Sequence, residues 1–343
     1  MKLKPPSWWY REQGAMATAL KPVSGLYGRI AEKKASQAAP YLSRLPVICV
    51  GNFTVGGSGK TPTAIAVAEI LKIAGERPAF LTRGYGGKEE GPVRVTEDMD
   101  ATRVGDEPLL LAQHAPTIVA GDREKGAKLI ETMDVTVIVM DDGFQNASIG
   151  KDLSLICVDA KTGIGNAMVL PSGPLRAPLE PQIRMADALI VVGEGTKANG
   201  LIDRFTDAGK LVLKAEIGFP QDTRWLGVLP VIGFAGIAQP DRFFRTLREA
   251  GARLVDKKVF PDHHRFTDRQ AQALLDEVEE RNCMLVTTEK DWVRLPDDRE
   301  TPAGELKFRS RPLPIEIRIG DEAALGDLMT ATIARKRGDV PKG

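Results

Sequence analysis

Residues 46–63 read PVICVGNFTVGGSGKTPT and combine an apolar run, a glycine-rich turn and a lysine–threonine pair. Val47, Ile48 and Val50 predict a buried strand, and the Ala- and Ile-rich segment after the turn predicts a helix. Glycine accepts backbone conformations that other residues avoid, so the turn can direct successive N–H groups toward phosphate oxygens. The stretch is therefore predicted to be a phosphate-binding loop, or P-loop, that follows a strand.

Within this loop, Lys60 is predicted to neutralise the outer phosphates of a nucleotide, and the Thr61 hydroxyl to bind Mg²⁺. The full P-loop pattern has glycine five residues before Gly59, where this chain has Thr54. The departure weakens the match, and a glycine-rich connection that binds nothing is the alternative. The residues predicted to contact the nucleotide are Thr54, Val55, Gly56, Gly57, Ser58, Gly59, Lys60, Thr61 and Pro62.

Composition narrows the class of protein. With 343 residues the chain is long for one core, so two domains are expected. No apolar run approaches the roughly 20 residues that span a bilayer, which excludes an integral helical membrane protein. A net charge of +1 argues against general nucleic-acid binding. Cys49, Cys157 and Cys283 lie singly in apolar runs, which predicts core thiols rather than a disulfide framework or a zinc site.

Residues 1–45 carry an excess of positive charge, with eight lysines and arginines against two glutamates. An apolar stripe at helical spacing runs from Met16 to Ile30, and Pro22 within it predicts a kink or two shorter helices. The stripe could pack on the domain behind it. Alternatively, it could lie on a membrane surface with Trp8 and Trp9 at headgroup depth and the cations facing anionic lipid.

Further along the chain, strand and helix signals alternate regularly. This alternation predicts an α/β fold of the P-loop NTPase type, with a doubly wound, mostly parallel sheet. A second series of alternating strand and helix signals begins past about Lys214. It predicts strands at 230–234, 254–260 and 284–288 and helices at 240–250 and 268–281. We therefore expect a basic segment over 1–45, a P-loop domain over 46–218, and a smaller α/β domain over 219–343 whose tail could return to the first.

Two acidic residues follow the apolar strand at 135–140. Such a strand downstream of a P-loop is typical of the carboxylate that holds Mg²⁺ in this class of nucleotide-binding protein. Asp141 is therefore predicted to be the metal ligand, and Asp142 beside it is a candidate catalytic residue. A polar turn without a ligand is the alternative.

Four further residues are candidates for catalysis. Asp106 precedes an apolar run, where it could cap a helix or act as a catalytic carboxylate. His263 and His264 are adjacent between a strand and a helix; because adjacent loop residues rarely converge on one ion, a catalytic histidine is favoured over a metal pair or a capping turn. Arg123 and Arg176 each follow a glycine-containing turn and are candidate phosphate contacts.

Several motifs occur together in one order. They are GNFTVGGSGKTP at 51–62, RGY at 83–85, GDEP at 105–108, DDGFQ at 141–145, GPLR at 173–176, DH at 262–263 and TEKD at 288–291. In that order they resemble the tetraacyldisaccharide 4′-kinases, the lipid A 4′-kinases of Gram-negative outer-membrane biogenesis. The resemblance covers nearly the whole chain, and DDGFQ together with this P-loop is highly specific. The family also tolerates a non-glycine residue at the position of Thr54.

The resemblance implies transfer of the ATP γ-phosphoryl group to the 4′-hydroxyl of a tetraacylated glucosamine disaccharide 1-phosphate. The enzyme would need Mg²⁺ and would lie peripherally on the cytoplasmic face of the inner membrane, with a glycolipid substrate, no nucleic acid and no obligatory protein partner. By similarity, Asp106 is the base and His263 pairs with it across a domain cleft. The family usually reads Gly-Pro-Leu-Arg-Glu-Pro, but here Ala177 follows Arg176, so a carboxylate is missing unless Glu180 or a water replaces it.

Two rival functions use the same P-loop. A nucleotide switch or ATPase acting on a partner protein could position a water with Gln145, although hydrolysis does not require Asp106 together with His263. A soluble small-molecule kinase would leave the basic Trp-Trp-Tyr segment at residues 8–10 unexplained.

Overall fold

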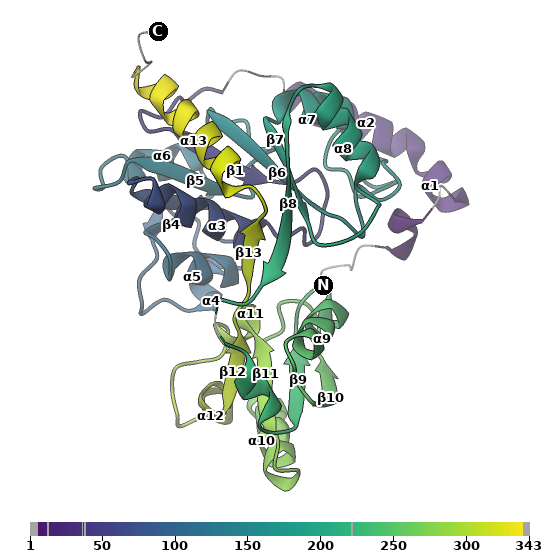
Figure 1. Cartoon of the computed structure of the whole chain (residues 1–343), viewed down its shortest axis with the longest axis vertical. Helices are drawn as coiled ribbons and strands as arrows, with labels where there is room; N and C mark the ends of the chain where they lie inside the picture. The colour runs from purple at the N-terminus through teal and green to yellow at the C-terminus, as the bar shows by residue number, and fades with distance from the viewer. Residues whose placement is uncertain (1–5, 12–13, 36, 38, 221, 339–343) are drawn as a thin grey trace.

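The computed structural model describes residues 6–11, 14–35, 37, 39–220 and 222–338. Lys2 and Lys4 of the predicted basic segment lie outside the described residues. Two α/β units are stacked along the long axis of the molecule (Figure 1), and the larger of them carries the P-loop. Its sheet has the strand order β13-β8-β7-β6-β1-β5-β2-β4-β3.

The large sheet is parallel except at its two edges, where β3 and β13 run antiparallel to their neighbours. The central strand β1 is buried on both faces and lies between β5 and β6. This confirms the predicted doubly wound α/β fold. The strands are β1 (Val47–Gly51), β2 (Pro78–Thr82), β3 (Val93–Arg94), β4 (Thr117–Val119), β5 (Val137–Asp141), β6 (Leu153–Asp159), β7 (Ala188–Val192), β8 (Leu211–Gly218) and β13 (Glu316–Ile319).

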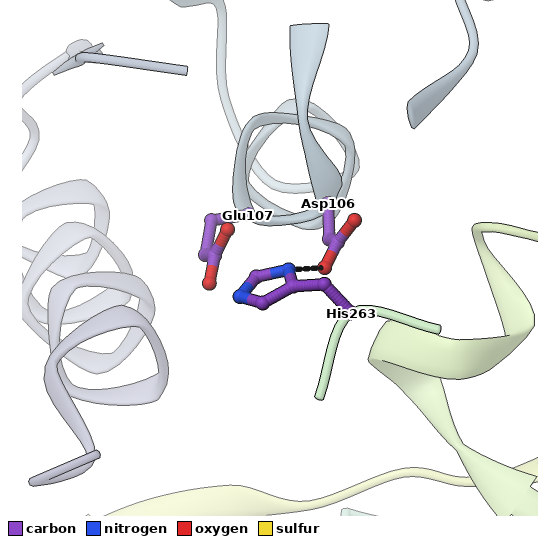
Figure 2. A group of neighbouring side chains, drawn as sticks. All are labelled: Asp106, Glu107 and His263. Atoms are coloured by element: carbon purple, nitrogen blue, oxygen red, sulfur yellow. Dashed lines mark hydrogen bonds and ion pairs between the residues drawn. The ribbon is translucent and has the colours of Figure 1, made fainter. Parts of the chain in front are cut away.

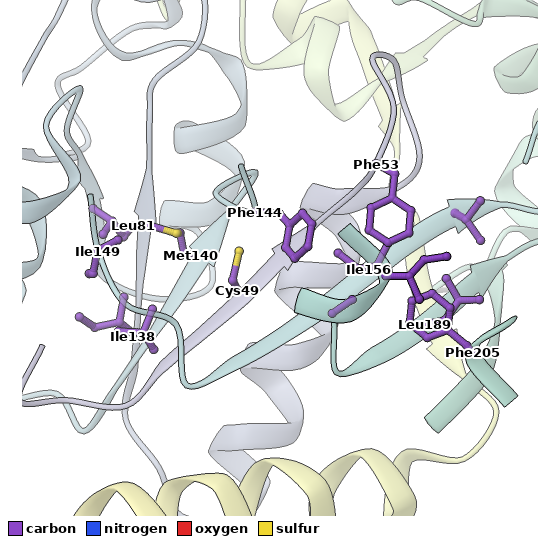
Figure 3. Close-up of a cluster of buried hydrophobic side chains, with 14 of the residues drawn as sticks. Cys49, Phe53, Leu81, Ile138, Met140, Phe144, Ile149, Ile156, Leu189 and Phe205 are labelled. Atoms are coloured by element: carbon purple, nitrogen blue, oxygen red, sulfur yellow. The ribbon is translucent and has the colours of Figure 1, made fainter. Parts of the chain in front are cut away.

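Helices cover both faces of this sheet, because apolar side chains project from both faces of its buried strands and must be shielded from water. One face packs against α6, α7 and α8, and its core includes Cys49 and a row of phenylalanines, Phe144, Phe53 and Phe205 (Figure 3). The other face packs against α3 and α13 and contains Cys157. The helices are α3 (Lys60–Ile73), α4 (Ala101–Val104), α5 (Asp106–Ala112), α6 (Arg123–Ile130), α7 (Leu179–Met185), α8 (Asn199–Asp207) and α13 (Glu322–Arg337).

The smaller unit has a four-stranded parallel sheet in the order β10-β9-β11-β12. The strands and helices predicted from 230 onward are present within one or two residues of their expected ends. The elements are η2 (Arg224–Gly227), β9 (Val231–Ala235), α9 (Pro240–Glu249), β10 (Leu254–Val259), α10 (Asp268–Glu280), β11 (Met284–Thr288), α11 (Glu289–Trp292), α12 (Pro302–Arg309) and β12 (Ser310–Leu313). Cys283, predicted to be a core thiol, is free but only half-buried.

The chain passes between the two units twice. It leaves the large sheet through β8 and returns through β13, which pairs antiparallel with β8 at Ile217 and Ile317. Afterwards α13 packs Leu325 and Met329 into the core beside α3. The division into 1–45, 46–218 and 219–343 stays a prediction.

The N-terminal segment forms η1 (Ser7–Tyr10), α1 (Ala15–Ala19) and α2 (Lys21–Ala35). The break between α1 and α2 falls next to Pro22, so the predicted stripe is split into two helices. The small residues Ser24 and Gly28 of α2 face the large unit, whereas its large apolar side chains face outward. Of the helices that the described residues form, none is both long and apolar enough to cross a membrane.

Candidate active site

The P-loop lies at the carboxyl end of β1, between that strand and α3. Gly56 and Gly59 have φ angles of 124° and 82°, which side chains with a Cβ rarely adopt, so glycine is required there. Thr54 is not among the described residues with positive φ, and it forms an antiparallel bridge with Leu175. A β-branched residue suits such an extended position, which explains why glycine is not needed at the place where the full pattern has it.

Thr61 and Asp141 meet beneath the loop. Because β5 is the neighbour of β1, the Asp141 carboxylate reaches the first turn of α3, and the Thr61 hydroxyl donates to its Oδ2 at 3.2 Å. Its other oxygen, Oδ1, is buried and has no hydrogen-bond partner among the described residues. Burial and the nearby Asp142 charge raise the pKa of Asp141 to about 7. An unpartnered buried carboxylate oxygen beside a threonine hydroxyl is a donor set that suits Mg²⁺.

Asp142 is held by two cations. Arg176 binds it with both terminal nitrogens, at 2.8 and 3.1 Å, and Lys60 Nζ lies 3.7 Å from its Oδ2. Burial opposes ionisation of Asp142, but the charges of Lys60 and Arg176 outweigh it and lower its pKa. Asp142 has a φ of 51°, a strained value for this residue type that is most often found at functional sites.

Arg123 is the most deeply buried cation of the group. It begins α6 and donates to the Ala120 carbonyl, while its Nε has no hydrogen-bond partner among the described residues. Burial, together with the neighbouring Arg83, lowers the pKa of Arg123 to about 10. The predicted cations Lys60, Arg123 and Arg176 therefore gather around the two carboxylates that follow β5.

The predicted acid–base pair is assembled from both units. Asp106 begins α5 in the large unit, and His263 lies on the connection between β10 and α10 in the small one. His263 Nδ1 donates to Asp106 Oδ2 at 2.7 Å (Figure 2). Burial opposes the charge of Asp106, but hydrogen bonds from His263 and Arg294 lower its pKa to about 2. His263 has a φ of 55°, a second strained residue at the site.

Glu107 and His264, the sequence neighbours of Asp106 and His263, make other contacts than the predicted pair does. Glu107 points into the same space as His263 (Figure 2) and accepts from Lys290 Nζ at 2.7 Å. Ligand atoms of Asp106, Glu107 and His263 lie within 4.8 Å of one another, yet both carboxylates already bind protein cations. His264 turns the other way, bonding Gln270 and stacking on a phenylalanine ring of the small unit.

One cleft of about 1690 Å³ connects these groups except Arg123, which does not line it. It is lined by residues 55–62, Asp141, Asp142, Arg176 and His263, whereas Asp106 lies behind the histidine rather than on the cleft wall. Apolar side chains of the N-terminal segment continue the wall, among them Trp8, Trp9, Leu20, Tyr27 and Ile30.

Ala177 leaves its position without a carboxylate, and Glu180 does not supply one. The Glu180 side chain is 64% exposed on α7 and pairs with Arg204. The Ala177 carbonyl instead accepts from the buried Gln182, which also accepts from Gln145.

Sequence reasoning missed Arg294. This residue follows α11 and its guanidinium contacts Asp106 and Asp291 directly. The available signal was its place three residues after Asp291 of the TEKD motif, a spacing that puts two side chains on one helical face.

A family model described as tetraacyldisaccharide-1-P 4′-kinase matches residues 16–334. The chain belongs to this family. The predicted family, lipid kinase function and enzyme class are thereby confirmed. Tetraacyldisaccharide 4′-kinases from Bradyrhizobium sp. and Rhizobium meliloti are 43% and 45% identical to it, over 99% and 97% of this chain and 98% and 96% of theirs. Among solved structures, LpxK from Aquifex aeolicus in complex with ATP matches with a TM-score of 0.72 and 27% identity, covering 93% of this chain and 99% of that one.

Proposed function

We propose that this chain transfers the γ-phosphoryl group of ATP to the 4′-hydroxyl of a tetraacylated glucosamine disaccharide 1-phosphate. One observation carries the proposal: the P-loop with its carboxylates and His263, whose Nδ1 is bound by Asp106, line a single cleft. Family membership and the ATP complex of the Aquifex aeolicus relative support the choice of donor and acceptor.

On the donor side, the loop at residues 54–62 cradles the phosphates, with backbone N–H groups from its glycine-rich part, and Lys60 neutralises the outer ones. Thr61 and Asp141 would hold Mg²⁺, which when bound would offset the negative charge of the phosphates. Arg176 and Arg123 stabilise the charge that develops on the transferred group. Lys60 and Arg176 are now bound to Asp142, so nucleotide phosphates would compete with this carboxylate for both cations.

On the acceptor side, Asp106 and His263 act together as the base. A sugar hydroxyl holds its proton until late in a phosphoryl transfer, so a modest base suffices if it is well placed. Because the two residues come from different units, the base forms only when the units adopt this closed arrangement.

The competing switch function assigns Gln145 to the attacking water. Gln145 donates to the Asn52 carbonyl at 2.7 Å and accepts from Arg176 at 3.3 Å, so both ends of its amide are engaged. These contacts favour a role for Gln145 in holding Arg176 in place. They therefore favour the kinase function over the switch function.

We also propose that the chain lies peripherally on the cytoplasmic face of the inner membrane, with α2 against the lipid. Leu26 and Ile30 are 63% and 62% exposed on α2, on the same face as Val23. A helix that buries its small side and exposes its large apolar side is suited to a bilayer surface. The positive charge of the segment would favour anionic lipid.

The N-terminal segment is fixed to the nucleotide site, which supports this orientation. Buried Ser24 donates to Ser172 Oγ at 2.7 Å, and Trp9 Nε1 donates to the Pro171 carbonyl at 3.1 Å. The same Pro- and Gly-rich connection leads to Arg176. Lipid bound at α2 would therefore reach the cleft along a wall that includes Tyr27 and Ile30.

The test is phosphoryl transfer from γ-labelled ATP to a panel of acceptors, with and without detergent. The panel contains the tetraacylated disaccharide 1-phosphate, the deacylated disaccharide and water alone. Label in the lipid product supports the proposal. ATP hydrolysis that is independent of acceptor would support the switch, and label only in the deacylated sugar would support a small-molecule kinase.

A further inference from the structure

Arg294 occupies the centre of a buried network where the two units meet. Its side chain is only 3% exposed. One terminal nitrogen donates to Asp106 Oδ2, the oxygen that also accepts from His263. The other donates to Asp291 Oδ1 at 2.7 Å and to the Gly236 carbonyl at 2.9 Å.

The same network also fixes the backbone of His263. The Gly236 carbonyl that accepts from Arg294 accepts from the His263 N–H at 2.9 Å as well. Asp291 is fully buried and accepts from the Gly236 N–H at 3.0 Å. Arg294 thus acts on both residues of the base: it contacts Asp106 directly, and it reaches the backbone of His263 through the Gly236 carbonyl.

We infer that Arg294 is a positioning residue of the proposed kinase reaction: it holds Asp106 ionised and orients it toward His263 in the closed arrangement. The inference rests on the proposed function and adds to it a cation that neither the P-loop nor the metal site provides. Arg294 lines the cleft, but it acts on the reaction through Asp106 and His263 and not by contact with substrate.

The geometry of arginine explains the choice of residue. A guanidinium presents several N–H groups in a fixed plane, so one side chain can bind Asp106, Asp291 and Gly236 at once. Lysine would carry the charge but could not hold the same fixed fork. The role therefore has two separable parts, charge and orientation.

Charge affects how easily the Asp106–His263 pair is protonated. Charged and titratable groups face the pair from several elements. They are Glu107 from α5, Tyr85 from the turn after β2, Asp262 from the loop of His263, and Lys290, Asp291 and Arg294 from α11 and the turn after it. Glu107 and Lys290 pair with each other. Removing the Arg294 cation leaves Asp291 and Asp106 less compensated, so protonation of the pair becomes easier.

The experiment is the pH profile of kcat for the full chain between about pH 5 and pH 9, with ATP and the tetraacylated disaccharide 1-phosphate saturating. Arg294→Gln should lower kcat about tenfold or more and move the acid limb to higher pH by about one unit, because a neighbouring charge shifts a pKa by 1–3 units. The KM for ATP should change little, because the P-loop belongs to the other unit. Arg294→Lys should lower kcat but keep the acid limb near its wild-type position.

Arg242→Gln is the matched control. Arg242 also crosses between the units, where it donates to Asp159 at 2.9 Å, but it does not contact Asp106 or His263. Its removal should leave the acid limb in place. Circular dichroism reports whether each variant folds. If Arg294→Gln does not fold, the kcat of Arg294→Lys tests the inference.

The inference would be overturned by an unmoved acid limb in folded Arg294→Gln, or by wild-type kcat in Arg294→Lys. An equal shift of the limb in Arg242→Gln would also overturn it, by making the effect one of unit closure in general. Absence of lipid phosphorylation by the wild-type chain would instead reject the proposed function.

Discussion

The two walls of the cleft are built differently. The phosphate wall comes from one sheet, where the P-loop follows β1 and Asp141 ends the adjacent parallel strand β5, so neither is contributed by the small unit. On the acid–base wall, His263 lines the cleft and bonds Asp106, which lies 157 residues earlier in the chain and on the other unit. The first wall is therefore built within one unit, whereas the second depends on how the two units are placed relative to each other.

The two walls also differ in how their charges are balanced. On the phosphate wall, Lys60, Arg123 and Arg176 are partly desolvated cations, and burial lowers the pKa of Lys60. A surplus of such cations suits an incoming polyanion. On the acid–base wall, acids and cations are paired, Asp106 with Arg294 and Glu107 with Lys290. That wall is organised to fix one proton acceptor rather than to attract charge.

The largest expected effect is on the phosphate wall. Lys60→Ala should abolish transfer and leave the fold intact, because the lysine charge serves phosphates rather than core packing. The measurement is labelled-phosphate transfer, with thermal unfolding as the check on folding. Near-normal activity in a folded variant would contradict the assignment of Lys60, and with it the phosphate-binding role of this wall.

Next in size are the losses on the acid–base wall. Asp106→Ala and His263→Ala should each lower kcat by roughly 10²–10⁴, with smaller changes in ATP affinity, since general acid–base catalysis contributes that much. Because the residues act as a unit, the double variant should be little worse than the poorer single one. A double-mutant cycle on kcat measures this.

His264→Ala is the control for that cycle, since His264 bonds Gln270 away from the cleft, and it should cost little. Fully additive losses at Asp106 and His263 would mean that the two act independently. A larger loss at His264 than at His263 would move the assignment by one residue.

The metal site should show an intermediate effect. Asp141→Asn should reduce kcat about 100-fold and respond poorly to added Mg²⁺, because a metal ion supplies several kcal/mol of charge stabilisation and the variant removes a charged ligand. Titration of activity with Mg²⁺ measures it. If Asp142→Asn were damaging and Asp141→Asn harmless, the roles within the pair would be exchanged.

A smaller effect is expected where the cleft meets lipid. Replacing both Leu26 and Ile30 with Gln should weaken binding to anionic vesicles about 30-fold, because each exposed apolar side chain contributes on the order of 1 kcal/mol when it enters the interface. Point variants are better than deleting residues 1–30, since deletion would also uncover Ser172 and Pro171. Val228→Gln is the matched control, because Val228 is 75% exposed on the other unit. Equal binding by all variants would contradict contact between α2 and the membrane.

The smallest effect concerns stability on the acid–base wall. The pKa of Asp106 falls from 3.8 to about 2 on folding, so its ion pairs stabilise the protein above pH 4 and are lost as the pH falls toward 2. Asp106→Asn should therefore be destabilising by ~2 kcal/mol at pH 7, and the difference from wild type should shrink between pH 4 and pH 2. Urea unfolding at several pH values measures it. A difference that does not change with pH would show that Asp106 is not held by charge.

Local sequence predicted much of the phosphate wall because its parts are short and contiguous. An apolar strand, glycines at the two positions with positive φ, and a Lys-Thr pair are encoded within one stretch, and an apolar strand ending in Asp141 is encoded in another. Parallel sheets place such strand ends at one edge, so proximity follows from the fold class. The roles of the individual site residues stay predictions.

The sequence by itself therefore determined the fold class, the P-loop, the candidate carboxylates and, through its motifs, the family. The tertiary structure decided which side of α2 faces outward, that Glu180 pairs with Arg204 away from the site, and that Arg294 joins Asp106 to the loop of His263. The physical reason is range. Turn conformation and strand burial depend on neighbouring residues, whereas a side chain's partner across two units depends on how separate cores pack, and no local pattern records that.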